Sequence, residues 1–168
     1  MEKGSVLIEV AISCLILALT VTALVPMFIL ALRADKNSEK IQMATDLSAE
    51  LLEEVRMRRW DQLTPTPSVH IPTPSTVLGV DAGETATDKR TFNDIDDFNN
   101  WKESSVLDPV MRPVAGVSSY SRTVTVKYVD PNLVAVSPGT TTDRKQVTVC
   151  ASGIKMQPIC LDTVIGNR

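Results

Sequence analysis

Hydrophobic residues fill the start of the chain and leave almost no polar position there. Residues 5–32 are nearly all apolar, and no charged residue occurs from position 10 to position 32. A helix rises about 1.5 Å per residue, so this stretch is long enough to cross the ~30 Å hydrocarbon core of a bilayer. The pattern therefore predicts a membrane-spanning helix that contains one carboxylate, Glu9, and one proline, Pro26.

The helical pattern continues beyond the apolar stretch with a different spacing. Residues 33–40 are mostly polar but contain no glycine or proline that would end a helix. Apolar side chains then recur every three or four positions, at Ile41, Ala44, Leu47, Leu51 and Val55. Such a stripe normally packs against a folded domain, so we expect one helix over residues 5–60. Pro26 should bend or loosen its membrane half, and Glu54 and Arg58 should form a four-residue ion pair.

The remainder of the chain predicts short strands joined by turns. Prolines within residues 63–90 favour extended, solvated backbone, and stretches that alternate apolar and polar residues follow. The predicted strands are residues 77–80, 118–129, 133–136, 144–150 and 159–165. Short turns between successive strands favour an antiparallel meander on the helix, with Leu47, Leu51 and Val55 under Val124 and Val126. The predicted fold class is therefore α+β, a long N-terminal helix packed on a small antiparallel sheet.

Composition narrows the classes of function. The 168 residues leave room for one membrane helix and one modest domain, and the net charge of −3 without a basic patch argues against nucleic-acid binding. The sequence has no phosphate-binding glycine loop, no Cys–His pair with metal spacing and no serine beside a base. The adjacent acids Asp96–Asp97 and Glu53–Glu54 are expected in solvent, and the lone His70 has no orienting neighbour. The sequence thus predicts neither an enzyme nor a bound cofactor.

Residues 90–101 combine acids and amides with aromatic side chains. Asp94, Asp96 and Asp97 are interspersed with Phe92, Ile95, Phe98 and Trp101. Clustered carboxylates suit calcium, so a site formed by Asp94, Asp96 and Asp97 is one hypothesis. The spacing is not that of an EF-hand loop, and the glycine of that loop is absent. We favour a capped turn or short helix that holds no metal, with its aromatics under the sheet and its acids outward.

Glu9 needs a partner that the neighbouring sequence does not provide. A carboxylate in a membrane helix is normally neutralised, and no basic residue lies within one helical turn of Glu9. Gly4 is followed by Ser5, three apolar residues and Glu9. This arrangement resembles the class III signal of the type IV pilin superfamily, in which a short leader ends in glycine and glutamate is the fifth mature residue. Pro26 also falls where many family members carry a proline.

The resemblance implies a processing and assembly pathway. A prepilin peptidase would cut after Gly4 and methylate the new amine of Ser5, where the family usually has phenylalanine or methionine. Glu9 would pair with the N-terminal amine of a neighbouring subunit, because an ammonium group makes a buried carboxylate tolerable. The implied partners are this peptidase, other pilin subunits and an inner-membrane assembly platform. The implied location is the bacterial inner membrane with a periplasmic head, and later the pilus at the cell surface.

The resemblance also divides the chain and suggests its role. The expected parts are a leader (residues 1–4), a transmembrane and filament-core helix (5–32), an amphipathic helix (33–61) and a β-rich head (62–168). The acidic and aromatic segment favours the minor-pilin and pilus-modification branch, whose members are structural subunits that prime or modify a filament. Two alternatives stay open. A pseudopilin of a type II secretion system shares the signal, and a single-pass periplasmic binding or sensor module would keep residues 1–4.

The three cysteines fall in two places. Cys14 lies inside the apolar helix, where it serves as a small apolar residue. Cys150 and Cys160 lie near the C-terminus and form either a disulfide or two buried thiols in adjacent strands. The resemblance favours the disulfide, because family members often clip their C-terminal region this way and an oxidising periplasm permits it.

Overall fold

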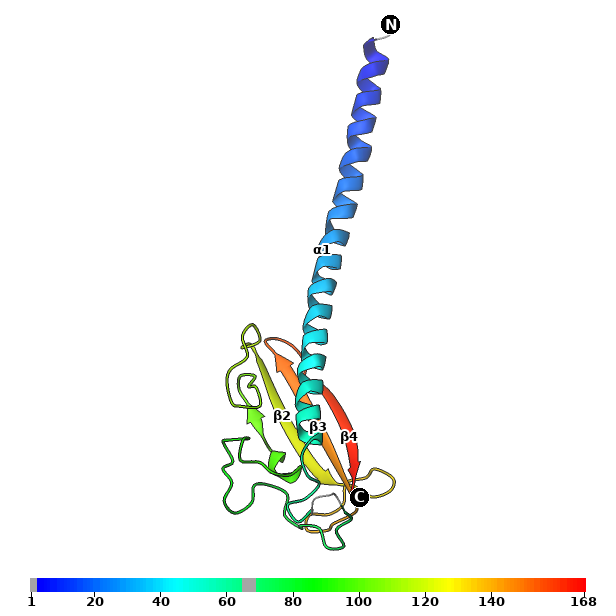
Figure 1. Cartoon of the computed structure of the whole chain (residues 1–168). Helices are drawn as coiled ribbons and strands as arrows, with labels where there is room; N and C mark the ends of the chain where they lie inside the picture. Colours follow the sequence, from blue (N-terminus) through cyan, green and yellow to red (C-terminus); the bar gives the residue numbers. More distant parts are fainter. Residues whose placement is uncertain (1–2, 65–68) are drawn as a thin grey trace. The chain divides into compact units, whose positions relative to one another are not determined.

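The computed structural model describes the backbone of residues 3–64 and 69–168, with side chains described from residue 8 onward (Figure 1). Met1 and Glu2 of the predicted leader lie outside the described residues, as do residues 65–68 of the proline-rich stretch. The chain divides into two units, Met1–Lys40 and Ile41–Arg168. Helix α1 (Lys3–Arg56) begins in the first unit and ends in the second.

In the N-terminal unit, α1 exposes a surface that is apolar over residues 10–32 and polar over residues 33–40. Every side chain from residue 8 to residue 32 is exposed in the single chain, and the helix continues through Pro26. The hydroxyls of this stretch bond inside the helix: Ser13 Oγ donates to the carbonyl of Glu9 at 2.8 Å, and Thr20 Oγ1 to that of Leu17 at 2.8 Å. This stretch is long and apolar enough to cross a membrane.

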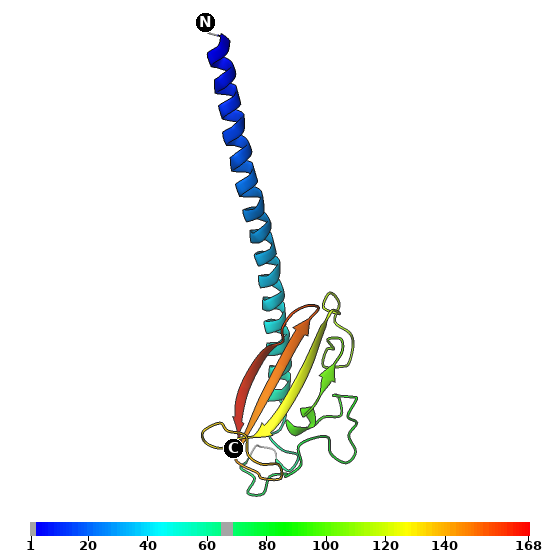
Figure 2. The same ribbon diagram turned by 180° about the vertical axis from the view of Figure 1, so that it is seen from behind.

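In the C-terminal unit, the last part of α1 covers one face of a four-stranded antiparallel sheet, and no helix of the described residues covers the other face (Figures 1 and 2). The strands are β1 (Lys102–Glu103), β2 (Tyr120–Tyr128), β3 (Arg144–Gly153) and β4 (Ile159–Gly166), and they lie side by side in chain order. A short 3₁₀ helix, η1 (Asp96–Phe98), precedes β1. The α+β fold class predicted from the sequence is therefore confirmed.

Alternation along the strands places the core between sheet and helix. On β2, Val124, Val126 and Tyr128 are buried, while the residues between them face solvent. Leu51 and Val55 of α1 pack with these residues, as predicted. Leu47 does not; it belongs to a second cluster with Ala44, Val106, Val117 and Ala151. The prediction for Leu47 was wrong because the core divides into two clusters along α1. The cluster that contains Leu47 packs against a loop as well as the sheet.

Element boundaries follow hydrogen bonding that the sequence pattern does not show. The helix ends at Arg56 rather than at residue 60. The predicted strands at 118–129, 144–150 and 159–165 correspond to β2, β3 and β4. Residues 77–80 and 133–136 form no strand, so those two predictions were wrong. In the first stretch, the carbonyl of Leu78 accepts from Asn99 Nδ2 at 3.2 Å; in the second, Asp130 Oδ1 accepts from the amide of Val134 at 2.8 Å and closes a loop.

Candidate functional site

The predicted processing and assembly residues lie in α1 of the N-terminal unit. Gly4 and Ser5 are helical, and their side chains lie outside the described ones. Glu9 is exposed on the helix, and Pro26 lies within it. Residues 10–32 separate the Glu9 carboxylate from the next charged residue along the chain, so Glu9 lies in an otherwise uncharged apolar surface. A carboxylate in such an apolar helix surface is normally neutralised by a positive charge when the helix lies in a membrane.

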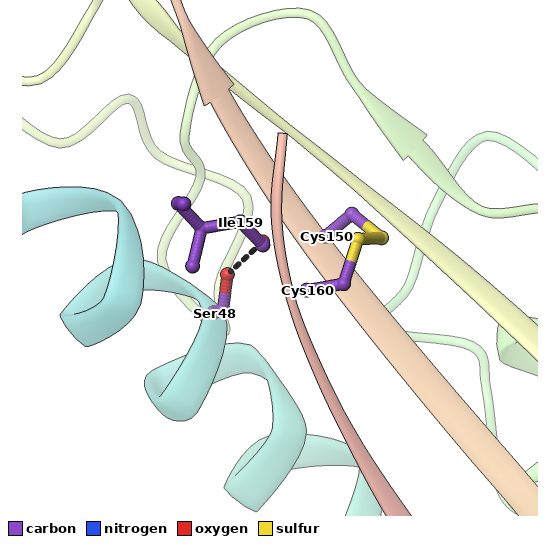
Figure 3. The surroundings of a disulfide bond; sticks show 4 residues. All are labelled: Ser48, Cys150, Ile159 and Cys160. Carbon is purple, nitrogen blue, oxygen red and sulfur yellow. Dashed lines mark hydrogen bonds between the residues drawn. A yellow bond between two sulfur atoms is a disulfide. The ribbon is translucent and has the colours of Figure 1, made fainter. Parts of the chain in front are cut away.

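Cys150 and Cys160 form a disulfide, the pairing that the resemblance favoured. They are direct cross-strand partners in the β3–β4 register, and Cys160 is exposed. Figure 3 shows the bond on the side of the strands away from α1, where it closes the turn that joins β3 to β4. On the helix side, Ser48 Oγ donates to the carbonyl of Ile159 at 3.2 Å and holds the start of β4 against α1 (Figure 3).

A buried ion network joins α1 to the sheet near β1, the edge strand opposite β4. Glu103 on β1 accepts from Lys89 Nζ at 3.1 Å and from Arg122 Nε at 2.8 Å, and all three side chains are fully buried. Lys89 also donates to Glu54 of α1 at 2.9 Å, and Arg122 donates to the carbonyl of Leu47 at 3.2 Å. The predicted Glu54–Arg58 pair is thus wrong, because Glu54 turns inward to a lysine that the helix pattern does not reveal.

A second buried cation, Lys145 on β3, binds one of the three acids proposed for calcium. Its Nζ donates to Asp96 Oδ1 at 2.5 Å and to the carbonyl of Trp60 at 2.6 Å, and it lies 3.8 Å from Asp61 Oδ2. The ammonium also lies 4.1 Å from the centre of the Trp60 ring. Lys145 and Asp96 therefore neutralise one another, which satisfies two charges that the core could not otherwise accommodate.

Asp94, just before η1, and Asp97, within η1, accept hydrogen bonds from the backbone in a reciprocal arrangement. Asp94 Oδ1 accepts from the amides of Asp96 and Asp97, at 2.9 and 3.4 Å. Asp97 Oδ2 accepts from the amides of Asn93 and Asp94, at 2.8 and 3.0 Å. One oxygen of each carboxylate thus accepts hydrogen bonds from backbone amides. The second oxygens, Asp94 Oδ2 and Asp97 Oδ1, are buried and have no hydrogen-bond partner among the described residues.

A neighbouring turn brings two more acids to this place. The amide of Glu84 donates to the carbonyl of Asp81 at 3.1 Å, and Gly83 between them has φ of +100°, which glycine adopts without strain. Glu84 accepts from the side-chain amide of Asn93. Carboxylate oxygens of Asp81, Asp94 and Asp97 lie within 4.8 Å of one another. We call Asp81, Glu84, Asp94 and Asp97 the acidic cluster.

Burial and like charge raise the pKa values of Asp81, Asp94 and Asp97. Desolvation, followed by the negative charge of Asp96, raises the pKa of Asp94 to about 8. Desolvation and the adjacent Glu84 carboxyl raise the pKa of Asp97 to about 7. The pKa of Asp81 is raised as well, by burial and by the charge of Glu84. Ionising these carboxyls at neutral pH therefore costs free energy, because burial and the neighbouring negative charges oppose it.

The sequence pattern indicated a group of acids at residues 94–97, but the predicted orientation of their side chains was wrong. Asp94, Asp96 and Asp97 were expected to point outward, yet their exposed fractions are 1%, 3% and 2%. That prediction was wrong because the aromatic residues that alternate with them anchor the turn beneath α1 and leave no outward face. Asp81 and Glu84 were missed, since only tertiary structure joins their turn to residues 93–97. Arg122 and Lys145 were also missed, although both occupy inward positions of alternating strands.

No protein-family model, curated protein or solved structure matches this chain. The chain is defined by its own architecture, in which an N-terminal apolar helix continues into a segment that packs on a small antiparallel sheet. That arrangement is compatible with a pilin-like fold.

Proposed function

We propose that this chain is a structural minor pilin, a subunit processed after Gly4 and assembled into a type IV pilus through its apolar helix. The observation that carries the proposal is Glu9, the one charged residue among positions 5–32, located five residues beyond Gly4. A plain membrane anchor gives no reason for a carboxylate at that position, because its insertion costs free energy. A filament gives one, since an N-terminal amine of a neighbouring subunit would neutralise it.

The assembly mechanism follows from solvation. Residues 8–32 expose apolar side chains on all sides and are stable in lipid or against the same segment of neighbouring subunits. Exchanging lipid for neighbouring helices keeps this surface dry, and the Glu9–amine pair would set the axial register of the exchange. The C-terminal unit contributes a separate folded body, closed by a disulfide, that would stay outside the filament core.

The N-terminal mass of the purified chain tests the proposal. We expect the chain produced together with a prepilin peptidase to begin at Ser5, and the chain produced without the enzyme to keep residues 1–4. Mass spectrometry of the intact protein reads this difference directly. A chain that keeps Met1 in both cases would contradict the proposal and favour a single-pass periplasmic binding or sensor module.

A further inference from the structure

The acidic cluster contains more carboxyl groups than the neighbouring cations can neutralise. Six carboxyl groups belong to this region: the four of the cluster, and Asp61 and Asp96 beside Lys145. Lys145 lies against Asp96 and Asp61. Within the described residues, no salt bridge reaches Asp81, Glu84, Asp94 or Asp97. The nearby guanidinium of Arg59 donates to Asn93 Oδ1 at 2.5 Å instead.

Two atoms within the cluster point to a ligand. Asp94 and Asp97 are almost completely buried, and Asp94 Oδ2 and Asp97 Oδ1 accept no hydrogen bond from any described residue. An unpaired buried carboxylate oxygen costs free energy that a core residue does not normally bear. Two such oxygens in adjacent acids, with backbone amides holding the other oxygen of each, are arranged to bind a positive charge.

The spacing of the oxygens fits a hard divalent cation. Calcium binds oxygen ligands at about 2.3–2.6 Å, so two ligands on opposite sides of one ion lie at most about 5 Å apart. Carboxylate oxygens of Asp81, Asp94 and Asp97 lie within 4.8 Å of one another. Calcium also accepts an irregular set of ligands, whereas magnesium demands near-ideal octahedral geometry and keeps several waters.

We propose that Asp81, Asp94 and Asp97, with Glu84 beside them, form a Ca²⁺ site in the C-terminal unit. The ion would join the turn at residues 81–84 to the turn at residues 93–97, two segments that the backbone alone does not pair. It would also supply the positive charge that the carboxylates do not receive from a side chain. The site differs from the sequence hypothesis in two members: Asp81 replaces Asp96, which Lys145 engages, and Glu84 is added.

Calcium titration of the full chain in detergent, after removal of divalent ions, tests the site. We expect saturable binding heat with one site per chain and a dissociation constant of about 10⁻⁵–10⁻³ M. Calcium should also raise the unfolding midpoint by several degrees. Both tryptophans, Trp60 and Trp101, lie buried in the C-terminal unit, so their fluorescence follows the unfolding of that unit.

Asp97→Asn separates binding from folding. The asparagine oxygen keeps the two backbone hydrogen bonds, while the charge is lost. We expect at least a 10-fold weaker affinity for calcium together with an unfolding midpoint in chelator that equals or exceeds that of the wild type. Asp46→Asn, an equal charge change at an exposed position of α1, should bind like the wild type.

Three outcomes would overturn the proposal. The first is no saturable heat and no shift of the midpoint up to about 10 mM Ca²⁺. The second is an unchanged response in Asp97→Asn, which would place any bound ion elsewhere on the chain. The third is an equal affinity for Mg²⁺, which would remove the calcium assignment. None of these readouts involves a filament, so their failure is independent of the proposed pilin function.

Discussion

A few side chains carry the buried charge of the C-terminal unit, and they form separate ion networks with different partners. Glu103 and Glu54 together neutralise Lys89 and Arg122 within the core, and Lys145 is shared by Asp96 and Asp61. Such pairs contribute little net stability compared with apolar residues, but removal of one partner leaves a buried charge without compensation. The two networks therefore act chiefly as constraints on how the loops and the helix meet the sheet.

Replacing Glu103 should destabilise the unit strongly. Glu103→Gln replaces the carboxylate with a neutral amide whose oxygen accepts from one of the two cations while its NH₂ group opposes the other, so we expect a loss of about 3–5 kcal/mol in the free energy of unfolding. Urea unfolding of the full chain, followed by tryptophan fluorescence, measures it. Glu53→Gln is the matched control: Glu53 pairs with Arg56 on the exposed side of α1 and should change stability by less than about 1 kcal/mol. Equal effects of the two variants would contradict the network.

The acidic cluster predicts an unusual pH dependence in metal-free buffer. Desolvation and the negative charges of Asp96 and Asp97 raise the pKa of Asp94 to about 8, although the positive charge of Lys145 opposes this shift. Desolvation and the adjacent Glu84 carboxyl raise the pKa of Asp97 to about 7. A carboxyl whose pKa is raised on folding stabilises the fold while it is protonated. That contribution is complete below the unfolded value near 4 and is lost as the pH rises through 7 to 8.

Stability in chelator should therefore fall from pH 5 to pH 8, by roughly 1 kcal/mol per pH unit for each carboxyl that stays protonated only in the fold. Thermal unfolding at a series of pH values measures the slope. Asp97→Asn, which keeps the amide hydrogen bonds and loses the titrating group, should flatten the profile. A free energy of unfolding that rises from pH 5 to pH 8 would contradict this prediction, because it would show that the carboxyls of the cluster are solvated and have ordinary pKa values.

At the scale of elements, β4 depends on bonds from both sides. It pairs with β3 along one edge only, and the Cys150–Cys160 disulfide joins the two strands on the face away from α1. From the helix side, Ser48 and Trp60 each donate to a carbonyl of β4, at 3.2 Å in both cases. The last strand is thus held covalently near its start and by hydrogen bonds to α1 and its C-terminal extension.

Removing the disulfide should loosen this strand without unfolding the chain. A loop closed by a sequence separation of 10 stabilises by about 2.5–3 kcal/mol in the chain-entropy model, so the double variant Cys150→Ala, Cys160→Ala should lose about that much. Urea unfolding with and without reductant measures it, since reductant should destabilise the wild type alone. Cys14→Ala, in the apolar helix, is the control that should leave the unit unchanged. A wild type insensitive to reductant would argue against the bond.

At the scale of the whole molecule, the two units have different environments. The N-terminal unit exposes apolar side chains at almost every position from 8 to 32, whereas the C-terminal unit buries its own core beneath α1. An apolar surrounding favours the first, because its apolar side chains are exposed, whereas the second already buries its apolar side chains. That contrast is what a subunit would need if one part packs in a filament core and the other contacts solvent.

Replacing Glu9 should separate membrane insertion from assembly. Glu9→Ala removes the proposed partner of a neighbouring amine and makes the helix more apolar, so we expect an expressed, membrane-held protein that fails to join filaments. Immunoblots of the membrane and sheared-filament fractions measure both properties. Glu39→Ala, an equal change in the polar part of α1, should assemble normally. Unaltered incorporation of Glu9→Ala would contradict the proposed register mechanism.

Regular patterns in the sequence were sufficient for the framework of the fold. The uninterrupted apolar run and the stripe at positions 41–55 reflect a helix surface, and alternation in residues 118–129 reflects a sheet with one buried face. These patterns arise from local geometry, a period of 3.6 or 2 residues, and need no partner to be recognised. For that reason α1, β2, β3 and β4 were predicted, whereas residues 77–80 and 133–136 were wrongly assigned to strands.

Tertiary structure alone decided the charged sites. The sequence places Asp81 and Asp94 in separate segments, and Lys89 far from Glu103, with no period to connect them. Whether an acid is solvated, paired with lysine or left with a free oxygen depends on which loops meet, because each alternative has a different desolvation energy. The sequence by itself therefore determined a helix with one isolated acid and a small sheet; the fold determined that Asp96 binds Lys145 while Asp94 and Asp97 converge on Asp81.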